Sequence, residues 1–151
     1  MTIPTDDSER ITTIVQRFAA LALSEGLTKK STEYKARRRA FIVDEVHIGF
    51  AAVFGGNTSS LVAWKDLLRT VGIEGAEALA SIKQCKAALK GKFVNIVDLV
   101  DAASAGSVMK RGVFDSEQAL ARYIRRTKKS YPCSKAKTNQ LLRQFLIKVG
   151  K

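Results

Sequence analysis

Residues 93–100 read FVNIVDLV, and the conformation of this stretch decides the fold class of the chain. Asn95, followed three residues later by Asp98, is typical of the start of a helix. The apolar side chains recur at the three- and four-residue steps of a helix, at Phe93, Ile96, Val97 and Val100. Because the run is short and rich in β-branched residues, a buried strand is the main alternative. We predict a helix here.

Six further stretches of the chain have the same helical period, each bounded by capping residues, glycines or a proline. They are predicted to run from Thr5 to Gly26, from Ser31 or Thr32 to Phe54, from Thr58 or Ser59 to Gly72, from Gly75 to Leu89, from Asp115 to Pro132 and from Leu141 to Val149. The stretch that ends at Leu89 can also be two short helices, because Ser81 and Gln84 have the spacing of a capping box. Gly106 and Gly112 bracket a connection with room for a turn or a hairpin.

These patterns predict an all-α fold, a compact single-domain bundle of about six or seven helices. The domain covers residues 1–151, with residues 1–5 as a flexible N-terminus. The helix from Ser31 or Thr32 to Phe54 is basic in its first half and apolar around much of its second half. We therefore expect its second half to be buried and its first half to face water.

The net charge of the chain is its most unusual property. It carries 26 Lys and Arg against 14 Asp and Glu, a formal charge of +12. Such an excess repels itself in the folded state, so it predicts a polyanionic partner, of which nucleic acid is the leading candidate. The N-terminus lacks the order of a secretory signal, and no apolar run approaches the roughly 18 residues of a membrane span. We expect a nuclear or cytoplasmic protein that does not bind membranes.

The strongest basic feature lies after Glu117, where residues 118–151 contain ten Lys and Arg and no acid. Within the helix predicted there, four cations fall at steps that place them on one face: Arg122, Arg125, Arg126 and Lys129. Leu120, Tyr123 and Ile124 would turn toward the core. Like charges on one face destabilise a helix, so we interpret this face as a binding surface, with an ordinary solvated face as the alternative.

A second basic stripe consists of Lys83, Lys86 and Lys90. With the preceding helix and the turn from Gly72 to Gly75, it has the outline of a helix-turn-helix. A simple pair of antiparallel helices is the commoner meaning of this pattern. Lysines alone also contact phosphates without reading bases. Gln84 is the one residue of this stripe suited to base recognition.

The sequence offers little support for catalysis. His47, the only histidine, lies among apolar residues of a predicted helix, which favours a core or partner-facing role over a general base. Cys85 and Cys133 lack the spacing of metal ligands with each other or with His47, and no disulfide is indicated. We expect no enzyme activity, no cofactor, no metal and no catalytic residue.

One further pattern consists of Trp64, Leu67, Gly72, Ile73, Ser81, Ile82, Cys85, Lys86, Leu89, residues 94–100 and the segment from Asn139 to Leu146. On these residues the chain resembles a group of small basic proteins of filamentous fungi. The resemblance runs from about Tyr34 to Leu146. It implies a fungal source and a domain complete in itself, and it implies no activity or site residue.

The predicted function is nucleic-acid binding through phosphate contacts with limited sequence specificity, with DNA favoured over RNA. The principal contacts are predicted at Arg122, Arg125, Arg126, Lys128, Lys129, Lys135 and Lys137. Secondary contacts are predicted at Arg37, Arg38, Arg39, Lys83, Lys86 and Lys90. The alternative is a protein-interaction adaptor or effector whose basic face docks an acidic protein partner, with or without formation of a homodimer.

Overall fold

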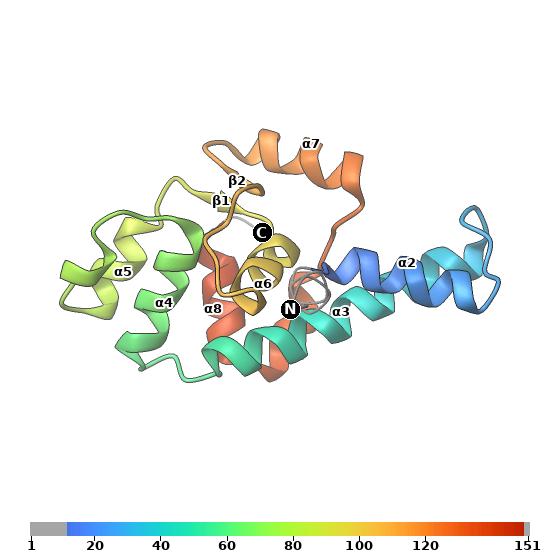
Figure 1. Ribbon diagram of the computed structural model, residues 1–151. Coiled ribbons are helices and arrows are strands. Elements are labelled where there is room, and N and C mark those ends of the chain that lie inside the picture. Colours follow the sequence, from blue (N-terminus) through green and yellow to red (C-terminus); the bar gives the residue numbers. More distant parts are fainter. Residues whose placement is uncertain (1–11, 150–151) are drawn as a thin grey trace, which may run out of the picture.

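The computed structural model describes residues 12–149 (Figure 1). This part of the chain forms seven α-helices, two short 3-10 helices and one small two-stranded sheet, which confirms the all-α prediction. The α-helices are α2 (Ile14–Ser24), α3 (Thr32–Phe54), α4 (Leu61–Val71), α5 (Ile82–Ala88), α6 (Ile96–Ser104), α7 (Glu117–Thr127) and α8 (Gln140–Lys148). The 3-10 helices are η1 (Ala76–Ala78) and η2 (Cys133–Thr138).

Residues 93–100 take both conformations that the sequence allowed. Phe93 and Val94 form strand β1 (Phe93–Val94), which pairs antiparallel with β2 (Val113–Phe114). Asn95 then caps α6, its side chain accepting a hydrogen bond from the backbone N–H of Asp98 at 3.1 Å. The connection between Gly106 and Gly112 contains turns rather than a hairpin, and it returns the chain from α6 to β2 beside β1.

One hydrophobic core joins helices α2 to α6 and α8. The second half of α3 contributes a single stripe, Ile42, Val46, Phe50 and Phe54. The expectation that this half is buried around most of its surface is wrong, because Ile48 and Val53 face solvent.

α6 lies near the centre of the molecule and crosses α3 closely at Gly49, where a Cβ would lie 2.5 Å from the Val100 side chain. A larger residue at Gly49 would push the two helices apart.

Several predicted helix limits shift by a few residues. α2 begins after Thr13, whose side chain and that of Gln16 form a capping box. The start predicted at Thr5 and the tail predicted over 1–5 lie outside the described residues. α4 is capped by Ser60 rather than by Thr58 or Ser59, and α7 by Ser116 rather than by Asp115.

The stretch up to Leu89 is divided as its capping box allows, into η1 and α5, with Ser81 as the cap of α5. Residues 72–81 therefore separate α4 from α5, whereas a helix-turn-helix has a turn of about three or four residues. The α4–α5 pair therefore lacks the short turn of a helix-turn-helix. Within residues 12–149, no helix is both long and apolar enough to cross a bilayer.

Candidate nucleic-acid interface

α7 lies at the edge of the fold, outside the main hydrophobic core. Leu120 and Tyr123 are buried under it but do not belong to the core cluster. Ile124, also predicted to face inward, is half-buried, and Arg122, Arg125 and Arg126 are exposed on the opposite side. The Tyr123 ring packs against Phe114 of β2, with their centroids 5.2 Å apart, and polar interactions add to this contact at the C-terminal end of α7.

The first of these interactions is a buried network around Asp98 of α6. Asp98, only 6% exposed, accepts hydrogen bonds from the Tyr123 hydroxyl at 2.5 Å and from Lys129 Nζ at 2.8 Å. Asn95 Nδ2 donates to the backbone carbonyl of Lys129 at 2.9 Å. These contacts fix the connector, which we define as residues 128–132, against α6.

The charges of this network stabilise one another. Burial by itself would lower the pKa of Lys129, but the hydrogen bond and the attraction of Asp98 outweigh burial, and the pKa lies above its ordinary value. Burial and then the Asp98 carboxylate raise the pKa of Tyr123, which keeps the phenol protonated as a donor. Gly112 closes over the carboxylate, at φ +86°, where a Cβ would lie 2.5 Å from Asp98 Oδ2.

The second interaction is a cap on the C-terminus of α7. Lys128 takes a left-handed conformation, at φ 60°, and ends the helix. Arg38 of α3 donates to the backbone carbonyls of Lys128 at 2.8 Å and Thr127 at 3.3 Å. A guanidinium suits this position, because the last carbonyls of a helix lack partners and carry partial negative charge. Burial lowers the pKa of Arg38.

This helix end corrects the prediction for Lys129. The chain was predicted to stay helical to Pro132, with Lys129 on the face of the three arginines. That prediction is wrong, because α7 ends at Thr127 and the Lys129 side chain turns inward to Asp98. Its side chain is 15% exposed, and its ammonium group is already paired.

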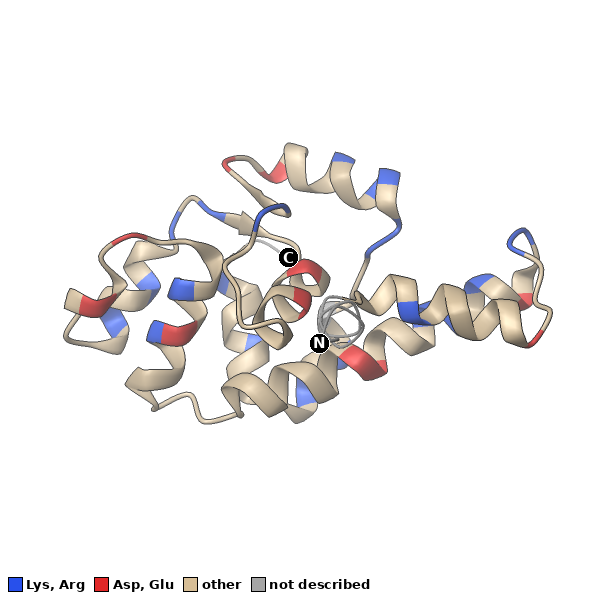
Figure 2. Ribbon diagram, viewed as in Figure 1, with Lys and Arg blue, Asp and Glu red and all other residues tan. Residues whose placement is uncertain are grey.

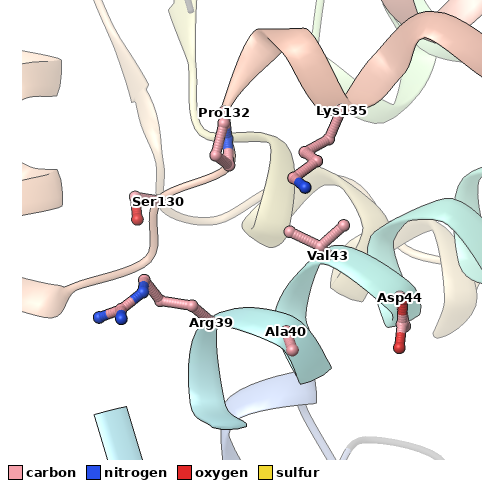
Figure 3. Close-up of a pocket in the computed structure, with 7 residues that line it drawn as sticks. All are labelled: Arg39, Ala40, Val43, Asp44, Ser130, Pro132 and Lys135. Atoms are coloured by element: carbon pink, nitrogen blue, oxygen red, sulfur yellow. The ribbon is translucent and has the colours of Figure 1, made fainter. Parts of the chain in front are cut away.

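A hollow opens between α3 and the connector (Figure 3). Its volume is about 350 Å³. Arg39 from α3 and Lys135 from η2 supply its cations. Figure 3 shows the Arg39 guanidinium on the side of Ser130, the Lys135 ammonium over Val43, and the Asp44 carboxylate directed away from both cations. The remaining lining is apolar: Ala40, Val43 and Pro132. The two cations thus lie on different sides of the hollow, where each could contact a phosphate oxygen.

A second, wider hollow lies along α7 itself. Arg122, Arg125 and Arg126 line it with Phe114, Ala119 and Tyr123, around a volume of about 610 Å³. The Arg126 guanidinium stacks over the Tyr123 ring, 5.3 Å from its centroid. This contact directs one arginine along the helix surface while leaving its donors accessible.

His47 has a structural partner. Its Nε2 lies 2.5 Å from the hydroxyl of Tyr131 in the connector, so the pair ties the connector to α3. Within the described residues, no group of His, Cys, Asp and Glu side chains could hold a metal ion. Cys85 is a buried free thiol whose pKa burial raises.

Of the basic clusters predicted from sequence, two meet and one lies apart (Figure 2). The Arg38 cap and the shared hollow bring the start of α3 beside the end of α7 and the connector. Arg37 is drawn away by ion pairs with Glu25 at 2.6 Å and Glu33 at 3.9 Å. Lys83, Lys86 and Lys90 line a separate hollow on α5, together with Lys148 of α8.

Sequence reasoning missed Ser130 and Lys148. Ser130 lies at a hollow formed by segments far apart in the chain, and Lys148 reaches α5 because α8 packs back toward β1. For neither residue does the neighbouring sequence contain a pattern that predicts a binding role. No protein-family model matches the chain, and comparisons with curated proteins and with solved structures found no match.

Proposed function

We propose that the protein binds nucleic acid through its phosphates. The contact surface, which we call the α7–connector surface, consists of Arg39, Arg122, Arg125, Arg126, Lys128 and Lys135, with Lys137 beside it. The observation that supports the proposal is that these cations are exposed and that, within residues 12–149, none forms an ion pair with an acid. The Asp98 network and the Arg38 cap hold α7 and the connector in place beside α3.

The chemistry of the surface favours the phosphate backbone over the bases. Arginine forks bind phosphate oxygens in pairs, and lysines act as point charges. Phe114 and Tyr123, the aromatic residues beside the arginines, are half-buried and buried, so they offer little area for stacking unpaired bases. We therefore expect duplex DNA to be preferred over single strands and RNA, with limited sequence specificity. Such a partner implies a nuclear or cytoplasmic location.

The test is a salt series with unrelated duplex DNA, single-stranded DNA and RNA. With six phosphate contacts on a duplex, affinity should fall by about three decades or more between roughly 50 and 200 mM salt. The Arg125→Gln/Arg126→Gln variant should bind more weakly and reduce the slope of log affinity against log salt by about 2. No binding at low salt, or a slope near zero, would overturn the proposal.

A matched control removes two charges elsewhere. Lys29 and Lys30 are exposed in the turn between α2 and α3, so Lys29→Gln/Lys30→Gln should leave the slope unchanged. Equal losses in both variants would mean that net charge, rather than this surface, drives binding. Capture of an acidic protein that survives nuclease treatment, without binding of purified duplex, would replace nucleic acid by a protein partner.

A further inference from the structure

A second basic hollow lies where α5 meets the end of α8. Lys83, Lys86 and Lys90 of α5 line it with Lys148 of α8, and its volume is about 690 Å³. The other lining residues are Ala87, Gly91 and Ile147, so no acid takes part. We call this the lysine hollow.

The fold holds these lysines outward. Cys85 and Leu89 anchor the inner face of α5, and both are fully buried. The Lys86 ammonium lies 5.4 Å from the centroid of the Trp64 ring, which fixes one lysine against α4. The backbone N–H of Val94 donates to the carbonyl of Val149 at 3.3 Å, and this bond brings the end of α8 beside the chain that leaves α5.

The lysine hollow is separate from the α7–connector surface. Figure 2 shows α5 and the C-terminal end of α7 far apart, with the β1–β2 pair and the start of α7 between them. The intervening region carries charges of both signs: Lys110 and Arg111 are exposed, Lys92 is paired with Asp115 at 3.5 Å, and Asp115 and Glu117 are exposed. A phosphate backbone that passed from one basic surface to the other over the start of α7 would meet the carboxylates of Asp115 and Glu117.

We propose that the lysine hollow binds the phosphates of a second nucleic-acid segment, so that one molecule bridges two duplexes. The inference rests on the proposed function. Charge complementarity supports it, since four lysines suit phosphates without selecting bases. The stiffness of DNA supports two segments rather than one. The persistence length of duplex DNA is about 150 base pairs, whereas a folded chain of this size has a radius of gyration of only about 15 Å, so DNA is nearly straight on the scale of the protein. A duplex on the α7–connector surface would have to bend around the fold to reach the lysine hollow, and bending so short a duplex costs free energy.

The test is co-capture of two duplexes. One duplex of about 20 base pairs, far shorter than the persistence length, is fixed to beads, and a second carries a fluorophore. The full-length protein is added at low salt and the retained fluorescence is measured. The wild type should retain the second duplex. Lys83→Gln/Lys90→Gln should lose retention by about tenfold, while its binding to the fixed duplex stays within about twofold.

Two controls accompany the test. Lys29→Gln/Lys30→Gln is the charge-matched control and should bridge two duplexes as the wild type does. The lysine double variant leaves Lys86 on Trp64, so an unchanged near-ultraviolet circular dichroism spectrum checks its fold.

Retention of the second duplex that persists in this variant would point to a second protein copy and overturn the inference. Absence of retention with intact single-duplex binding would overturn bridging alone, whereas absence of any duplex binding would overturn the proposed function as well.

Discussion

α7 and the connector that follows it are similarly basic in sequence, yet their cations do different things. Arg122, Arg125 and Arg126 are exposed and form no ion pair within the described residues. Lys129, three residues after Arg126, is half-buried; it pairs with the buried Asp98 and holds the connector to α6. A count of basic residues therefore does not distinguish cations that stabilise the fold from cations that are available to bind a partner.

Removal of the Lys129 charge should have the largest effect on stability. Lys129→Met leaves the Asp98 carboxylate buried with the Tyr123 hydroxyl as its remaining side-chain donor. Loss of one partner of a buried ion pair typically costs about 3–5 kcal/mol, so we expect the free energy of unfolding at neutral pH to fall by about 3 kcal/mol. Urea unfolding followed by circular dichroism measures the loss.

Two controls sharpen this comparison. Arg125→Met, on the exposed face, should change the free energy of unfolding by less than about 0.5 kcal/mol. Combining Lys129→Met with Asp98→Asn should cost less than the sum of the single variants, with a coupling of about 1.5 kcal/mol or more. Equal losses at positions 125 and 129 would remove the distinction between the two groups of cations.

The Arg38 cap should have an intermediate effect. Arg38→Gln removes the charge and the forked donor at the end of α7, so we expect a loss of about 1–2 kcal/mol in the free energy of unfolding. Exchange of the amide hydrogens in the last turn of α7 should accelerate, because that turn depends on the cap. Lys35→Gln removes an exposed charge from the same helix and should leave both quantities unchanged.

The fold class followed from the sequence because helix signals are local. Periodic apolar residues, caps such as Ser31 and Asn95, and the left-handed glycine at position 72 act within a few residues of one another. The end of α7 escaped prediction, because its cap comes from Arg38, ninety residues earlier in the chain. Pro132 was the nearest local signal, and it lies five residues after the true end.

The candidate site was predictable only as a set of residue types. The exposed arginines of α7 could be placed on one face, because a helix fixes their relative directions. The roles of Lys129 and Arg37 could not be predicted, since each depends on an acid brought close by tertiary packing, Asp98 and Glu25 respectively. The separation of the α5 lysines from the other clusters likewise depends on how helices pack.

The smallest effect is expected at Asp101, one turn after Asp98 on α6. Its Oδ1 accepts a hydrogen bond from the backbone N–H of Ile14 at 2.9 Å, but its Oδ2 is buried without a partner among the described residues. Burial raises the pKa of Asp101 to about 6, and the neighbouring Asp98 carboxylate adds to the rise, against the opposing effects of the Ile14 hydrogen bond and of Lys129 and Arg17.

A raised pKa means that the folded state binds the Asp101 proton more tightly than the unfolded chain does. The stability that this proton contributes is therefore complete below about pH 4 and is lost as the pH rises through about 6. Asp101→Asn keeps an oxygen for Ile14 and cannot ionise. We expect it to raise the free energy of unfolding by about 1 kcal/mol at pH 7, with the gain shrinking toward zero near pH 4. Urea titrations at both pH values measure the difference. A variant less stable than the wild type at pH 7 would contradict the prediction, because it would show that the ionised Asp101 carboxylate stabilises the fold.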